Sequence, residues 1–179
     1  MSYNYRKDGR TDEQFEKEID ERTKIERRAA DSLLDNWLRK KSPQCCLEDH
    51  GCGNDGKVRR KGVTQKADFK LLNFGNKDYV LEMKVSPVGC VTLKEDQVNT
   101  LTKYGDTKQV YVDWCVDFEK PSEAHYLMTP ATTLKMFCTH GRYAAHPGFG
   151  GKRGWRLFRD QIDSLAGQYE FIKLTNKVS

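Results

Sequence analysis

Two short apolar segments on either side of a turn constrain the fold of this chain most strongly. Residues 67–74 read ADFKLLNF and residues 79–86 read YVLEMKVS, and the intervening residues 75–78 read GNKD. Apolar segments of this length that flank glycine, asparagine and aspartate are typical of a β-hairpin. The pattern therefore predicts two adjacent strands near the middle of the chain.

Acidic and basic side chains gather at one point of this hairpin. Residues two apart in a strand share a face, so Glu82 and Lys84 project together, and the hairpin returns them to Asp68. Two carboxylates beside a lysine can hold a hard cation such as Mg²⁺. The alternative is a solvated strand face with a weak ion pair, the commoner origin of a Glu-x-Lys pair. The opposite face carries the apolar residues Leu81, Met83 and Val85.

A known family shows the same spacing. Asp68 followed fourteen positions later by Glu82-x-Lys84 resembles the PD-(D/E)XK nuclease superfamily, which includes restriction endonucleases and archaeal-type Holliday junction resolvases. Ala67 stands where the superfamily's name has proline. The resemblance spans roughly residues 15–115 and implies a restriction endonuclease-like core. It also implies that both acids bind metal and that Lys84 is the catalytic lysine.

Two residues outside the hairpin extend this resemblance. Gln97 resembles the glutamine that many members carry on the helix after the lysine strand, although an ordinary exposed amide is the alternative. Glu26 resembles the acid that many members carry on the first helix. Its rivals on that helix are Glu16, Glu18 and Glu21. The resemblance implies Mg²⁺ or Mn²⁺ held by Asp68, Glu82, the carbonyl of Met83 and Glu26.

The implied activity is metal-dependent endonucleolytic hydrolysis of DNA phosphodiester bonds. A compact chain without an obvious recognition domain favours structure-selective cleavage in recombination or repair, by analogy with the fold, and a phage-encoded enzyme is compatible with this. A sequence-specific restriction endonuclease is the alternative. DNA is the expected partner, and cutting two strands with one metal site each suits a homodimer.

Composition sets the frame for this interpretation. The 179 residues correspond to one ordinary domain, and 8 Tyr, 8 Phe and 3 Trp argue against disorder throughout the chain. A net charge of +5 is consistent with a polyanionic partner but does not establish one. The chain has no apolar run of bilayer length and no secretory signal, so we expect a soluble cytoplasmic protein that does not bind membranes.

The periodicity along the chain predicts an α/β fold with a central mixed β-sheet flanked by helices. Residues 87–93 read as a loop, and a glycine-rich loop is expected to lead into a helix that carries Trp155, Leu157 and Ile162. The expected organisation is a flexible tail (1–12) and a single domain (13–179), divided into an N-terminal helix (13–41), a Cys/His-containing basic loop (42–64), a catalytic core (65–115) and a C-terminal strand and helices (116–179).

A cysteine-rich cluster offers a second hypothesis. Cys45, Cys46, His50 and Cys52 fall within eight residues and could bind a structural Zn²⁺. The usual C-x₂-C pairs are absent, so incidental thiols are the alternative. With zinc there, the chain could instead be a non-catalytic nucleic-acid-binding protein.

Two basic stretches could contact a nucleic-acid backbone. They contain Lys57, Arg59, Arg60 and Lys61 before the first hairpin strand, and Lys152, Arg153 and Arg156 near the C-terminus. Solvated basic loops are the alternative.

Overall fold

The computed structural model describes residues 9–51, 66–86, 89–104, 109–116, 125–145, 152–165 and 172–175. In chain order its elements are α1 (Asp12–Leu33), the π-helical segment η1 (Leu34–Leu38), α2 (Arg39–Lys41), β1 (Cys46–Asp49), β2 (Phe69–Phe74), β3 (Lys77–Ser86), β4 (Cys90–Lys94), α4 (Glu95–Tyr104), β5 (Val110–Val116), β6 (His125–Pro130), α5 (Ala131–Cys138), β7 (Arg142–Ala145), β8 (Arg153–Phe158), α6 (Arg159–Leu165) and β9 (Ile172–Thr175).

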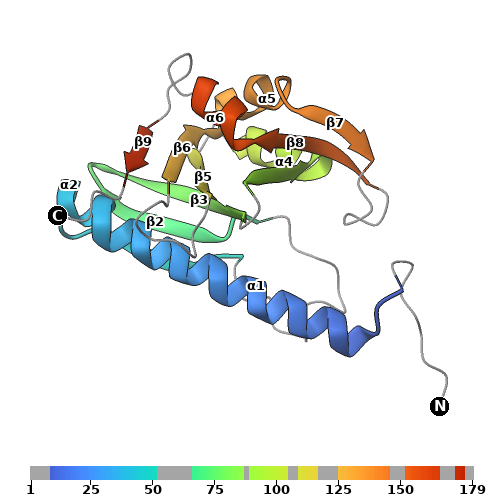
Figure 1. Ribbon diagram of the computed structural model, residues 1–179. Coiled ribbons are helices and arrows are strands. Elements are labelled where there is room, and N and C mark those ends of the chain that lie inside the picture. The colour runs from blue at the N-terminus through green and yellow to red at the C-terminus, as the bar shows by residue number, and fades with distance from the viewer. Residues whose placement is uncertain are drawn as a thin grey trace.

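A mixed sheet of six strands forms the centre of the molecule. Its strand order is β1-β2-β3-β5-β6-β9, in which β3 and β5 are parallel and the other neighbours are antiparallel. The long helix α1 crosses one face, and α4 and α5 lie on the other face with a smaller sheet of order β4-β8-β7 (Figure 1). The expected α/β fold with a central mixed sheet flanked by helices is confirmed.

The N-terminal helix begins with a capping box. The Thr11 hydroxyl accepts a hydrogen bond from the Gln14 amide at 3.1 Å, and the Gln14 side chain accepts one from the Thr11 amide at 3.0 Å. The helix expected over residues 13–41 is observed as α1, η1 and α2. The π-helical turn inserts one residue per turn, which shifts the phase of the helix as it crosses the sheet. No helix in the described ranges is long and apolar enough to cross a membrane.

Two hydrophobic cores lie on opposite faces of the central sheet. Alternation along β3 divides its side chains between them, as the sequence predicted: Leu81 and Met83 join one core and Val80 the other. The α1-side core contains Ala29, Ala30, Leu33, Leu34, Leu38, Cys45, Phe69, Leu71, Leu81, Met83 and Met128. The α4-side core contains Ala67, Val80, Val91, Leu93, Val98, Leu101, Val110, Val112, Ala131, Leu134, Phe137, Cys138, Leu157 and Ile162.

Three expected loop or helix segments are strands instead. Residues 46–49, within the expected loop 42–64, form β1 along β2, and residues 90–94, most of which fall in the expected loop 87–93, form β4. The helix expected through Trp155 and Leu157 is wrong at its start, because residues 153–158 form β8 and α6 begins only at Arg159. Each of these strands is six residues or shorter, so its pattern in isolation does not separate strand from loop or helix. The expected tail falls largely outside the described residues.

Candidate active site

The β2–β3 hairpin positions Asp68 beside the middle of β3. Asp68 immediately precedes β2, and its Oδ2 accepts a hydrogen bond from the Met83 amide at 2.8 Å. Its own carbonyl accepts bonds from the amides of His50 at 2.9 Å and Gly51 at 3.1 Å. Main-chain donors from two different segments therefore fix both the backbone and the carboxylate of this residue.

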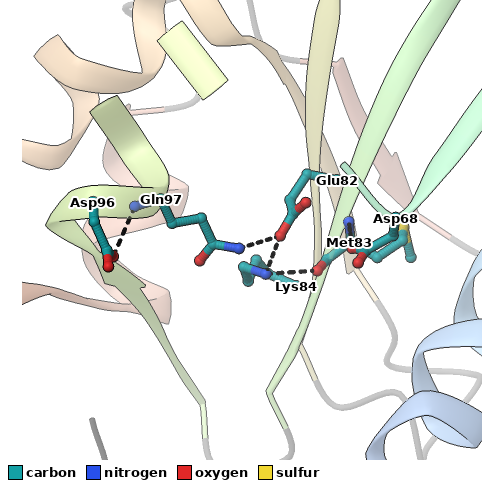
Figure 2. Close-up of polar contacts among 6 residues, drawn as sticks. All are labelled: Asp68, Glu82, Met83, Lys84, Asp96 and Gln97. Atoms are coloured by element: carbon teal, nitrogen blue, oxygen red, sulfur yellow. Dashed lines mark hydrogen bonds and ion pairs between the residues drawn. The ribbon is translucent and has the colours of Figure 1, made fainter. Parts of the chain in front are cut away.

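Glu82 is the centre of the polar network. The residue is 2% exposed, and its Oε1 accepts hydrogen bonds from Lys84 Nζ and from Gln97 Nε2. Lys84 Nζ also donates to the Met83 carbonyl at 3.2 Å. Figure 2 shows the chain of contacts that runs from Asp68 through Met83, Lys84 and Glu82 to Gln97. The ammonium thus contacts two oxygens from the expected ligand set.

Burial and mutual repulsion perturb the charges of this cluster. Burial raises the pKa of Glu82 to about 8, with Asp68 and Glu26 adding to the rise and Lys84 opposing it. Burial likewise raises the pKa of Asp68, against the pull of Lys84 and the Met83 amide. Burial alone would lower the pKa of Lys84, but Glu82, Asp68 and Glu26 hold it above its ordinary value. One lysine therefore interacts electrostatically with three carboxyl groups, so acids outnumber bases in the cluster.

Glu26 joins the cluster from the opposite layer. It lies on α1 and is partly buried, and burial raises its pKa to about 6, with Asp68 raising and Lys84 lowering it. Its rivals Glu16, Glu18 and Glu21 are exposed on the same helix. From two helices on opposite faces of the sheet, Gln97 thus contacts Glu82 directly, and Glu26 lies close enough to Asp68, Glu82 and Lys84 to interact with them electrostatically.

Asp96 and Lys94 also lie near the site, and neither was predicted from the sequence. Asp96 Oδ1 accepts a bond from the Gln97 amide at 2.9 Å, and its Oδ2 accepts one from Lys152 Nζ at 2.7 Å (Figure 2 shows the first contact). The Lys152 hydrogen bond is the main reason that the pKa of Asp96 lies below its ordinary value. Burial lowers the pKa of Lys94, and the nearby charge of Lys84 lowers it further. In the sequence, only the position of Asp96, directly before the expected Gln97, pointed to it.

The basic residues of the C-terminal stretch do not act as one patch. Lys152 is bound to Asp96, and the Arg153 guanidinium lies over the Tyr143 ring, 5.6 Å from its centroid. Arg156 lies on β8 with its Nε buried. The first basic stretch, Lys57, Arg59, Arg60 and Lys61, lies outside the described residues.

The cysteine cluster is spread over the start of β1. Cys45 is 2% exposed in the α1-side core, Cys46 begins β1, and the His50 amide follows the strand and bonds to Asp68. Cys52 lies outside the described residues. Within the described ranges, no three His, Cys, Asp or Glu side chains are grouped closely enough to hold a metal ion.

Comparisons with known proteins give a structural likeness but no match in sequence. No protein-family model matches the chain, and no curated protein matches it in sequence. Among solved structures, the chain is similar to Hjc, a Holliday junction resolvase from Archaeoglobus fulgidus, an archaeal hyperthermophile. The sequence identity is 12%, 75% of this chain and 91% of that chain are covered, and the TM-score is 0.43. We therefore base the functional proposal on the chemistry of the site.

Proposed function

We propose that this protein is a metal-dependent DNA endonuclease that hydrolyses phosphodiester bonds. The observation that carries the proposal is the buried cluster in which Lys84 is shared by Glu82, Asp68 and Glu26. Burying carboxylates in excess of their cations is costly, and strongly perturbed pKa values such as these cluster at functional sites. An acid-rich centre with one fixed lysine suits chemistry on a phosphate group, where negative charge must be neutralised.

The donor atoms are chemically suited to a hard divalent cation, but Asp68, Glu82 and Glu26 are not grouped closely enough in this structure to hold one, so binding would have to draw these acids together. Glu82 Oε1 and the Met83 carbonyl already contact one cation, the Lys84 ammonium. Oxygen ligands of this kind suit Mg²⁺ or Mn²⁺. Asp68, Glu82 and the Met83 carbonyl would hold the ion, with Glu26 completing the set from α1. When bound, it would neutralise phosphate charge and lower the pKa of a bound water.

The residues of the chain then divide the remaining work. Lys84 would donate a hydrogen bond to the attacking water or to a non-bridging phosphate oxygen. Gln97 holds the Glu82 carboxylate in place through its Nε2 and is thus a positioning residue. The Asp96 carboxylate fixes the start of α4 through the Gln97 amide and so maintains that geometry.

The substrate that we propose is branched DNA of the kind formed in recombination or repair. A compact sheet and its helices carry the centre, and no separate recognition module accompanies them in the described part of the chain. Paired sites in a homodimer would cut two strands. A phage-encoded enzyme of the host cytoplasm would fit this role.

Cleavage assays test the proposal. We expect Mg²⁺-dependent cutting of a four-way junction in preference to linear or plasmid DNA of the same length. Asp68→Ala and Lys84→Ala should abolish cutting, because they remove a ligand and the ammonium. Lys70→Ala is the matched control, because Lys70 lies on the neighbouring strand, in a surface ion pair with Glu48.

Cleavage by Lys84→Ala at the parental rate would show that the assignment of this centre is wrong. Zinc retained by the purified protein, without any Mg²⁺-dependent cutting, would favour the nucleic-acid-binding alternative. Far-ultraviolet circular dichroism of each variant separates loss of activity from loss of fold.

A further inference from the structure

The small sheet β4-β8-β7 has two faces of different chemistry. Val91, Leu93 and Leu157 are buried in the α4-side core, and Trp155 packs against it. Side chains alternate along a strand, so Arg156, between Trp155 and Leu157, points away from this core. The sheet register places Thr92, Arg156 and Arg142 in one row across the three strands. The outward face therefore carries two arginines directly opposite each other.

The two arginines of this row place like charges next to each other. Like charges directly opposite each other on neighbouring strands repel. In addition, Arg156 Nε is buried, and it has no hydrogen-bond partner among the residues that the structure describes. A buried donor without an acceptor is uncommon in folded proteins and often indicates a missing ligand or water. An anion between the two guanidinium groups would relieve both the repulsion and the unmet donor.

The row is joined firmly to the proposed active site. Strand β4 ends at Lys94 and α4 begins at the next residue, Glu95, whose Oε2 accepts a bond from the Tyr143 hydroxyl of β7 at 2.8 Å. Lys152 Nζ bonds to Asp96 beside Gln97. Lys94 interacts electrostatically with both Lys84 and Lys152. Glu95 and Asp96, at the start of α4, thus tie the small sheet to the helix that carries Gln97.

We infer that Arg142 and Arg156 together bind one backbone phosphate of the DNA strand that enters the active site. The inference rests on the proposed function, and it adds a contact point outside the catalytic centre. Two guanidinium groups can bind the oxygens of one phosphate with several charge-assisted hydrogen bonds. Arg142 carries no sequence signal, because only the register of β7 with β8 places it opposite Arg156.

Equilibrium binding without divalent cations tests this site independently of cleavage. Affinity of the full chain for a labelled four-way junction is measured by fluorescence anisotropy in EDTA, between about 50 and 200 mM salt. The double variant Arg142→Gln/Arg156→Gln should bind more weakly, and its slope of log affinity against log salt should be smaller by about 1. The ratio of parental to variant affinity should then fall about fourfold between the lowest and the highest salt concentration. The matched control is Lys40→Gln/Lys77→Gln, which removes two exposed charges elsewhere.

Thermal unfolding distinguishes a binding role from a structural one. If the pair serves a phosphate, Arg142→Gln removes a repulsion, and the melting temperature of the free protein should stay unchanged or rise. A fall in melting temperature together with the loss of affinity would overturn the inference, because the arginine would then support the fold.

Parental affinity and slope in the double variant would also overturn the inference, as would an equal loss in the lysine control. The inference would also be overturned if the affinity of the parent protein for DNA did not depend on salt. Salt-dependent binding through the arginine pair in a protein that never cleaves DNA with Mg²⁺ would refute the proposed endonuclease alone.

Discussion

We expect the Glu26→Gln substitution to stabilise the protein at neutral pH when no divalent cation is present. Burial, with a contribution from Asp68 and against the pull of Lys84, raises the pKa of Glu26 from 4.5 to about 6 on folding. The folded state therefore binds this proton more tightly than the unfolded state. The contribution of Glu26 to the unfolding free energy is therefore greatest below pH 4.5 and is lost as the pH rises through about 6.

The size of the effect follows from the difference in pKa. A difference of about 1.5 between folded and unfolded states corresponds to about 2 kcal/mol at pH 7, once Glu26 is ionised in both. A neutral glutamine of the same shape avoids this cost. For a chain of this size the gain amounts to roughly 4–8 °C in melting temperature.

Urea unfolding at two pH values measures this effect. The unfolding free energy of Glu26→Gln should exceed that of the parent at pH 7, and the difference should be nearly gone at about pH 4, where the glutamate is mostly protonated in both states. Glu21→Gln, an exposed acid on the same helix, is the matched control and should show no such pH dependence. Added Mg²⁺ should stabilise the parent more than the Glu26→Gln variant, because the variant lacks one of the proposed ligands.

A lower unfolding free energy for Glu26→Gln at pH 7 would refute the reasoning. So would an equal gain at both pH values, because packing rather than ionisation would then be responsible.

Two further substitutions have clear expected outcomes. In urea titrations at about pH 9, where Glu82 is ionised, Lys84→Met should lower the unfolding free energy by about 3–5 kcal/mol, because it leaves the Glu82 carboxylate buried without its cation, and adding Glu82→Gln should restore most of the loss. An unchanged stability of Lys84→Met would contradict the pairing. Gly51→Ala should lower the unfolding free energy by about 1–3 kcal/mol and also slow cleavage. Its new Cβ would lie 2.7 Å from the Ala67 carbonyl and would displace the strand start that holds Asp68. Parental melting temperature and cleavage rate for this variant would show that the contact is not restrictive.

The hairpin was predictable because its information is local. Alternation along residues 79–86 separates Glu82 and Lys84 from the apolar set, and the turn residues fix where the chain reverses, so β2 and β3 pair as expected. The approach of Gln97 to Glu82 was less secure, since it depends on how α4 packs after β4. The family resemblance, rather than periodicity, indicated that residue.

The missed features depend on partners that are distant in sequence. β4 and β8 are short, and their alternating residues acquire meaning only when the two strands pair with each other, some sixty residues apart. The role of Asp96 likewise depends on a distant partner, because Lys152 directly precedes β8. The opposition of Arg142 and Arg156 likewise exists only in the three-dimensional register.

The origin of the acidic residues in the chain has a consequence for the order of folding. Asp68, Glu82 and Lys84 come from one hairpin, whereas Glu26 arrives from a helix more than forty residues earlier. Local contacts close faster than distant ones, so the hairpin can bring the two acids and the lysine together before α1 docks. Docking then adds the third acid against electrostatic resistance. Pulse-labelled hydrogen exchange should show β2 and β3 amides protected before those of α1, and simultaneous protection would contradict this order.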